Sequence, residues 1–104
     1  EGPQSITKLN KIKMRSGMIL SNEPGYYKKN HFGIRIENLV YVDKKNGKLF
    51  FKNLTMAPIE KDLINFNLLN NSEKNYLFKY HLDVYSNISK YLKQNEKKWL
   101  ASLI

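Results

Sequence analysis

Short apolar runs bounded by turn residues mark the first half of the chain. Residues 18–22 form one such run, which ends at Glu23-Pro24-Gly25 because proline removes a backbone donor and glycine permits a turn. Residues 34–43 are rich in β-branched residues, and we expect both faces of this strand to be largely buried. One of those faces consists of Arg35, Glu37, Leu39 and Tyr41. The pattern therefore predicts strands in this part of the chain.

A hairpin should follow the second strand. Asn46-Gly47 is a strong turn signal, and residues 48–52 then return as a strand. We expect a further short strand over residues 54–57, which stops at Pro58 because proline cannot donate to a ladder.

The spacing of apolar residues changes to threes and fours after Ser72, which we expect to cap a helix. Its apolar face would be Leu77, Tyr80, Val84, Ile88 and Tyr91. A second short helix should begin near Asn95 and bury Trp99, Leu100 and Leu103. The chain is therefore predicted to be α+β, with a strand-rich region over residues 1–58 and a linker with C-terminal helices over residues 59–104.

Length and composition narrow the class of protein. A chain of 104 residues holds one small domain or part of one. It has no cysteine, which excludes disulfides and thiolate metal ligands and is compatible with a cytoplasmic location. No apolar run approaches the roughly 20 residues that a membrane span needs, and no signal-peptide pattern opens the chain. We therefore expect no membrane partner.

The net charge of +9 raises the question of nucleic-acid binding through phosphate contacts. Of the 18 basic residues, however, only Arg15 and Arg35 are arginine, and the rest are lysines spread along a chain with many asparagines. Proteins that read bases rely on arginine, and single-strand binders interleave aromatic residues along a basic groove. The composition therefore disfavours a nucleic-acid partner.

Two carboxylates occupy unusual positions. Glu23 ends one predicted strand, and Glu37 lies inside another on the same face as Arg35. If these strands pair across the loop between them, both carboxylates could converge and offer the oxygen ligands that hard divalent cations prefer. Spacing alone favours a simpler alternative, an ion pair between Arg35 and Glu37 with Glu23 at the surface. His31 and His81 have no metal-ligand spacing and are interpreted as loop or packing residues.

Two longer segments carry a family resemblance. Residues 17–27, Gly-Met-Ile-Leu-Ser-Asn-Glu-Pro-Gly-Tyr-Tyr, and residues 32–38, Phe-Gly-Ile-Arg-Ile-Glu-Asn, closely resemble the C-terminal half of aminopeptidase P, the Xaa-Pro aminopeptidase. The opening Glu-Gly-Pro and the Leu-Thr-Met-Ala-Pro of residues 54–58 also match segments of that family. The resemblance covers nearly the whole chain with its motifs in the right order.

The resemblance implies a pita-bread fold with two divalent metal ions, for which manganese is the expected metal. It implies that Glu23 binds one metal and acts as a general base, that Glu37 bridges both metals, and that Arg35 orients the site. The implied substrate is a peptide with proline second, from which the N-terminal residue is released.

The resemblance also implies that the chain holds two of five metal ligands, because the family's other three and a proton-shuttling histidine lie upstream of this segment. We therefore expect the missing N-terminal part of the catalytic domain as a partner, with a homo-oligomer left open, and little activity from this chain alone. Asn30 replaces a glycine that is common in the family, and asparagine tolerates the left-handed backbone that such a turn requires. The alternatives are an inactive remnant, a complementing subunit of a split peptidase, or a small basic binding module.

Overall fold

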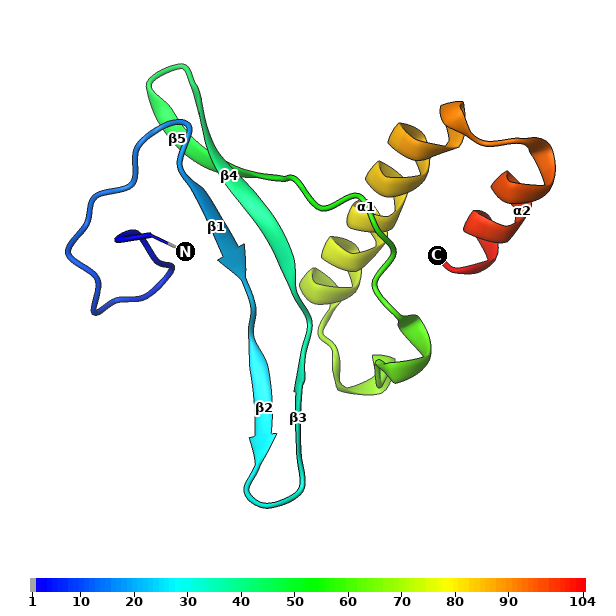
Figure 1. Ribbon diagram of the computed structural model, residues 1–104, viewed down its shortest axis with the longest axis horizontal. Helices are drawn as coiled ribbons and strands as arrows, with labels where there is room; N and C mark the ends of the chain where they lie inside the picture. Colours follow the sequence, from blue (N-terminus) through cyan, green and yellow to red (C-terminus); the bar gives the residue numbers. More distant parts are fainter. Residues whose placement is uncertain (1) are drawn as a thin grey trace. The chain divides into compact units, whose positions relative to one another are not determined.

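The chain folds into two units in the computed structural model, which describes residues 2–104. The first unit ends at Thr55, and the second comprises Met56–Ile104. The first holds all the strands and the second holds both α-helices of the described chain, so the predicted α+β order of strands followed by helices is present (Figure 1).

The first unit contains a three-stranded antiparallel sheet and a two-stranded hairpin. The sheet has the order β1-β4-β5, with bounds β1 (Ile19–Asn22), β4 (Asn38–Lys45) and β5 (Lys48–Asn53). The hairpin pairs β2 (Gly25–Lys28) with β3 (Phe32–Arg35). Because β2 follows β1 and β4 follows β3, the hairpin continues the β1–β4 pair as one long ribbon (Figure 1).

One face of the sheet forms the core of the first unit. Leu20 lies opposite Val40, and both pack with Val42 against Met14 and Met18. The other face is open, with Ile19, Leu39 and Phe50 all exposed. The expectation that both faces of residues 34–43 are largely buried was therefore wrong, since only alternate residues of β4 are covered.

The predicted strand over residues 34–43 is broken in two. β3 ends at Arg35 and β4 begins at Asn38, while on the neighbouring chain β1 ends at Asn22 and β2 begins at Gly25. Pro24 lies in the gap and has no N–H to donate, so the ladder is interrupted there. Within the break, the Ile36 N–H donates to the Pro24 carbonyl at 3.2 Å.

Two turns adopt the left-handed backbone that their residues favour. Asn46 and Gly47 have φ of 49° and 78°, as a type I′ hairpin turn between β4 and β5 requires, and the predicted hairpin is confirmed. Asn30, in the turn between β2 and β3, has φ of 61°, so the asparagine adopts the conformation expected of it.

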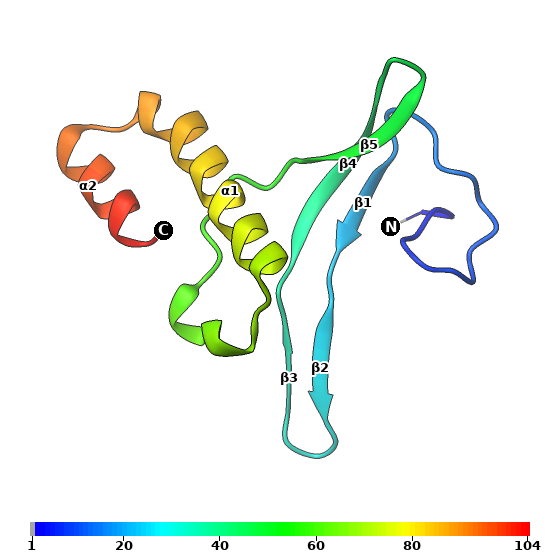
Figure 2. The same cartoon turned by 180° about the vertical axis from the view of Figure 1, so that it is seen from behind.

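The second unit is helical. Three short 3-10 helices, η1 (Lys61–Leu63), η2 (Phe66–Leu68) and η3 (Ser89–Tyr91), accompany α1 (Asn71–Ile88) and α2 (Gln94–Ser102). Its core joins Tyr80 and Val84 of α1 to Leu100 of α2, which folds back toward α1 (Figure 2). Neither α1 nor α2 has the length and apolar content needed to cross a membrane, and no other described helix has them either.

Four local predictions were wrong. Tyr91, expected on the apolar face of the helix, lies in η3 and is 77% exposed. Asn70, not Ser72, caps α1, in a capping box in which Asn70 and Glu73 each accept the other's backbone N–H. No strand forms over residues 54–57, where the Leu54 N–H donates to the Leu39 carbonyl of β4 and the Thr55 hydroxyl accepts the Leu39 N–H. Trp99 is 63% exposed instead of buried, although Leu100 beside it is in the core.

Candidate functional site

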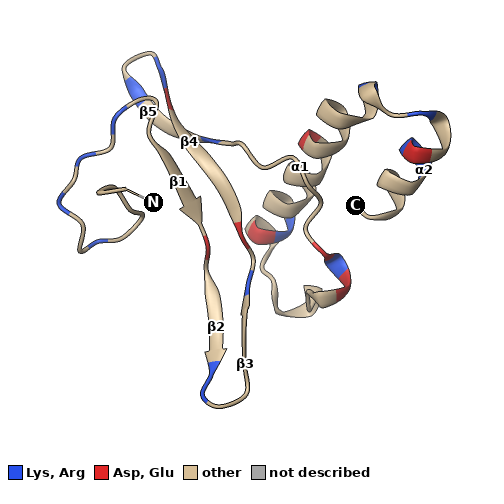
Figure 3. Cartoon of the chain, viewed as in Figure 1, with Lys and Arg blue, Asp and Glu red and all other residues tan. Residues whose placement is uncertain are grey.

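The break in the β ribbon brings three charged side chains together. Glu23 lies between β1 and β2, Arg35 ends β3, and Glu37 lies between β3 and β4. The Arg35 Nη1 donates to Glu23 Oε2, and Arg35 Nε lies 3.9 Å from Glu37 Oε2. Acidic positions therefore face each other where β1 gives way to β2 and β3 to β4, with a basic position beside them (Figure 3).

The strand register determines this convergence. On one side of the break Asn22 pairs with Asn38, and on the other side Gly25 pairs with Arg35. A side chain at Gly25 would not fit, because a Cβ there would lie 2.8 Å from the Cγ of Arg35. Glycine therefore lets the arginine side chain lie close against the opposite strand, within reach of Glu23.

Hydrogen bonds stabilise the charged form of Glu23. The Ser21 hydroxyl donates to Glu23 Oε1 at 2.6 Å, and the Arg35 guanidinium donates to the other oxygen. The Ser21 hydroxyl first, and Arg35 second, hold the pKa of Glu23 below its ordinary value. The side chains of all three charged residues are 40% to 48% exposed, so the cluster is open to solvent and to ligands.

The simpler alternative from the sequence describes only part of this arrangement. Arg35 does approach Glu37, but its hydrogen bond goes to Glu23, which is therefore not an isolated surface residue. Elsewhere, His81 of α1 is 8% exposed and its Nε2 accepts the Ile59 N–H at 3.1 Å, which is a packing role. His31 lies in the turn between β2 and β3.

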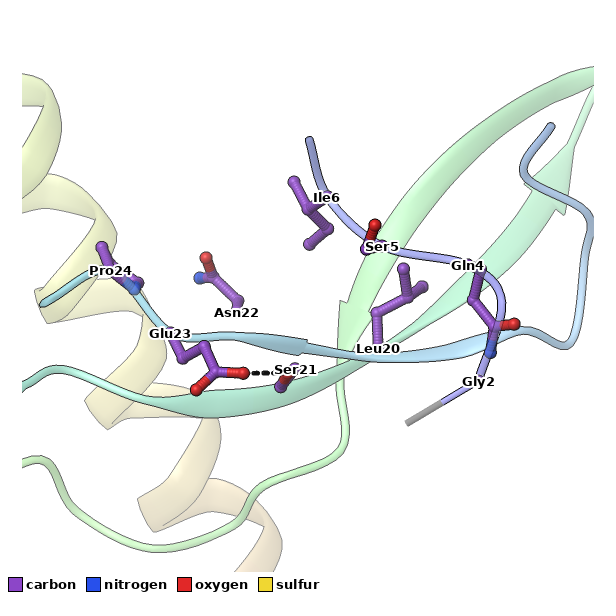
Figure 4. Close-up of a pocket in the computed structure, with 9 residues that line it drawn as sticks. All are labelled: Gly2, Gln4, Ser5, Ile6, Leu20, Ser21, Asn22, Glu23 and Pro24. Atoms are coloured by element: carbon purple, nitrogen blue, oxygen red, sulfur yellow. Dashed lines mark hydrogen bonds between the residues drawn. The ribbon is translucent and has the colours of Figure 1, made fainter. Parts of the chain in front are cut away.

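A cavity of about 510 Å³ adjoins Glu23 in the first unit (Figure 4). It is lined by Gly2, Gln4, Ser5, Ile6, Leu20, Ser21, Asn22, Glu23 and Pro24. Asn22 and Glu23 point to opposite sides of the strand, Glu23 toward Ser21 and Asn22 toward the segment that carries Ile6 (Figure 4). The cavity thus places mixed polar and apolar surface next to the charged cluster.

The donor set fits part of a metal centre. Carboxylate oxygens suit hard divalent cations, and each oxygen of Glu23 keeps a lone pair beyond its one hydrogen bond. Across residues 2–104, however, no three histidine, cysteine or acidic side chains are grouped so as to hold a metal. Glu23 and Glu37 therefore suit a shared site in which other residues supply further ligands.

Sequence reasoning missed the polar side chains that surround the cluster. Ser21 bonds Glu23, and Asn38 bonds both Asn22 and Asn53 across three strands. A signal for the asparagines exists, since Asn22 and Asn38 each adjoin one of the glutamates in the sequence. Their pairing could not be read without the strand register.

Two family models match nearly the whole chain. Residues 47–103 match the C-terminal region of peptidase M24, and residues 1–44 match metallopeptidase family M24. Together they cover both the strand unit and the helical unit.

Individual proteins of the same family are also similar to this chain. A probable Xaa-Pro aminopeptidase P of Laccaria bicolor is 41% identical over 96% of this chain and 18% of that protein. Aminopeptidase P2 of Arabidopsis thaliana is 40% identical over 96% of this chain and 16% of that protein. The Xaa-Pro aminopeptidase 1 of Dictyostelium discoideum is 38% identical over the full chain and 19% of that protein. The chain thus spans less than a fifth of the length of these curated relatives.

A solved structure shows the same fold. The X-prolyl aminopeptidase of Caenorhabditis elegans, described as a cytosolic enzyme with a di-nuclear active site, superposes with a TM-score of 0.73. It is 35% identical and covers 86% of this chain, which covers 16% of it. The expected arrangement of antiparallel strands followed by C-terminal helices is therefore confirmed. The chain belongs to the M24 metallopeptidase family and represents its C-terminal region, homologous to Xaa-Pro aminopeptidase P.

Proposed function

We propose that Glu23 and Glu37 are two of the ligands of a dinuclear metal centre that serves an Xaa-Pro aminopeptidase. The observation that supports this is the convergence of both carboxylates on Arg35 at the break in the ribbon, in a chain of the M24 family. The substrate would be a peptide with proline in second position, as the names of the relatives suggest. The further ligands would come from residues outside these 104.

Each residue of the cluster has its own task in this proposal. Glu37 would help to hold both metal ions, and Glu23 would help to hold one of them and would accept a proton as general base. Arg35 contacts both carboxylates and keeps them oriented toward each other. The two divalent ions, with manganese as the expected metal, would supply Lewis-acid stabilisation of the charge that develops on the peptide carbonyl.

The activity belongs to the assembled site. With two of the five ligands that the family resemblance implies, this chain alone should not hydrolyse a peptide. We therefore propose the remainder of the catalytic domain as its necessary partner, either in the same polypeptide or as a separate subunit. A cytosolic location is proposed by analogy with the nematode enzyme, which is described as cytosolic.

The test is a calorimetric titration of Mn²⁺ into the complete gene product that carries these residues, combined with an Xaa-Pro peptide cleavage assay. Glu37→Gln should abolish tight Mn²⁺ binding and cleavage together, because the amide removes a charged ligand. Asp83→Asn removes a carboxylate from exposed helix surface and serves as the matched control, with both readouts unchanged. Parent-like Mn²⁺ binding by Glu37→Gln would show that Glu37 is not a ligand.

A further inference from the structure

Three asparagine side chains form a hydrogen-bonded row across the three-stranded sheet. Asn22 ends β1, Asn38 begins β4 and Asn53 ends β5. The Asn22 Nδ2 donates to Asn38 Oδ1 at 3.0 Å, and the Asn38 Nδ2 donates to Asn53 Oδ1 at 2.6 Å. Asn22 pairs with Asn38, and Asn53 pairs with Val40, so all three side chains lie on the covered face of the sheet.

Asn38 is the central member and is almost fully buried, with 4% of its surface exposed. It uses one side of its amide as an acceptor and the other as a donor, so it alone joins the two outer asparagines. An apolar side chain of similar size would remove the partner of both partly buried neighbours, and a polar group left unsatisfied away from water is costly. The two side-chain hydrogen bonds of Asn38 therefore explain why this buried position suits asparagine better than an apolar residue.

The row lies directly beside the proposed metal ligands. Glu23 follows Asn22 and Glu37 precedes Asn38 in the sequence. Successive side chains of an extended chain point to opposite faces, and Figure 4 shows this alternation for Asn22 and Glu23. Each glutamate therefore points away from the row while its backbone is attached to it.

Backbone bonding is weakest at this point of the ribbon. Neither Glu23 nor Glu37 belongs to a strand, and the break carries the single backbone bond from Ile36 to Pro24 noted above. The asparagine row lies at the end of the three-stranded sheet that adjoins this break. Side-chain hydrogen bonds there can fix the relative positions of β1 and β4, which the interrupted backbone ladder leaves less constrained.

We infer that Asn38 is a positioning residue for the proposed metal centre. Its amide ties the end of β1 to the start of β4 and, through Asn53, to the end of β5, and so sets the separation of Glu23 and Glu37. This inference rests on the metal-ligand roles proposed above, because its effect on function passes through the two glutamates.

The test measures Mn²⁺ affinity by calorimetry and unfolding by denaturant in the complete gene product. Asn38→Leu should weaken Mn²⁺ binding by about 10-fold, the lower end of the usual effect of residues that support metal ligands. Asn38→Asp should bind Mn²⁺ more tightly than Asn38→Leu, with most of the parent affinity. A carboxylate of the same size can accept from the Asn22 amide, and it can also accept from Asn53 if the Asn53 amide rotates to present its N–H.

The matched control is Val42→Ala, which opens the same buried face four residues farther along β4 than Asn38. It should lower the unfolding free energy and leave Mn²⁺ affinity at the parent value. If Val42→Ala weakens Mn²⁺ binding as much as Asn38→Leu, affinity follows stability and the positioning role is overturned. Parent-like affinity in a folded Asn38→Leu variant overturns it as well.

If Asn38→Leu does not fold, Asn22→Ala answers the same question, since it removes the partly exposed end of the row that joins β1 to β4. Weakened Mn²⁺ binding in that variant supports the positioning role, and unchanged binding overturns it. Glu37→Gln is measured in parallel. Should it bind Mn²⁺ like the parent, the metal-ligand proposal itself fails, which is a different outcome from an asparagine variant that has no effect.

Discussion

Glu23 is the residue whose protonation state the surrounding structure controls most directly. It accepts one hydrogen bond from the Ser21 hydroxyl and one from the Arg35 guanidinium, and both favour the carboxylate over the acid. A general base must be deprotonated at the working pH, so this arrangement suits the proposed role.

Removing either partner should raise the pKa of Glu23. Because the folded pKa is lowered, the contribution to stability is present above the unfolded value of 4.5 and is lost as the pH falls through the folded pKa. Ser21→Ala and Arg35→Leu should each move the carboxyl titration, followed by NMR, to higher pH. Arg15→Leu, which removes the only other arginine, is the control. A Glu23 titration that stays in place in both test variants would show that neither bond acts on the carboxylate.

His81 gives the helical unit a pH dependence that comes from a basic side chain, whereas that of Glu23 comes from an acid. Burial, as the first cause, holds the pKa of His81 below the ordinary 6.5, since the charged ring would lose its hydration inside the helical unit. The unfolded chain therefore takes up the proton first, so stability is complete above pH 6.5 and is lost as the pH falls below it. Denaturant unfolding at several pH values should show this loss, and His81→Gln should reduce it. The same pH slope in that variant would contradict the assignment.

At the scale of elements, α1 begins where its capping box places it. Asn70 accepts the Glu73 N–H at 3.0 Å and Glu73 accepts the Asn70 N–H at 2.9 Å. Asn70→Ala should reduce the unfolding free energy by about 1 kcal/mol, the usual effect of losing such a cap. Asn75→Ala, at an exposed position in the second turn of α1, should leave stability unchanged or slightly raised because alanine favours helix. Equal losses from both variants in denaturant unfolding would argue against the cap.

The elements that the sequence predicts well are those with local causes. The turn at Asn46 and Gly47 follows from two residues that tolerate positive φ, and α1 follows from apolar residues spaced by threes and fours. The break after Arg35 has a non-local cause, since it faces Pro24 on the partner strand. The strand expected over residues 54–57 failed for a similar reason. The segment meets β4 at Leu39, through the Leu54 N–H and the Thr55 hydroxyl, and a side-chain bond of this kind does not continue a backbone ladder.

The candidate site likewise has features that the local sequence predicts and features that depend on distant strands. Glu23 and Glu37 could be singled out from their places beside a turn and inside an apolar run, yet spacing left an Arg35–Glu37 pair as the preferred interpretation. The structure gives Arg35 a hydrogen bond to Glu23 and a longer contact to Glu37, which depends on strand register across the break. The asparagine row lay beyond sequence reasoning because three separate strands contribute to it.

At the scale of the whole molecule, the first unit leaves an apolar sheet face open. Ile19, Leu39 and Phe50 are 51%, 45% and 36% exposed, and in the described chain β1 and β5 are edge strands of the sheet. Open edges and apolar faces pair readily with other chains.

This 104-residue chain by itself should therefore self-associate. Sedimentation velocity should show concentration-dependent oligomers, and Ile19→Lys with Leu39→Lys should reduce them because charge on the face opposes burial. Val42→Ala, on the covered face, is the control that should not reduce association. A parent chain that sediments as a monodisperse monomer and melts cooperatively would contradict the expectation.

The proposed metal centre connects these scales, since residue charge, strand register and the assembled domain all bear on it. Anomalous X-ray diffraction from manganese-loaded crystals of the complete gene product tests it most directly. We predict two manganese peaks, one in contact with Glu23 and both in contact with Glu37. Manganese peaks that touch neither glutamate, or a loaded protein with no peak beside either, would contradict the proposed function.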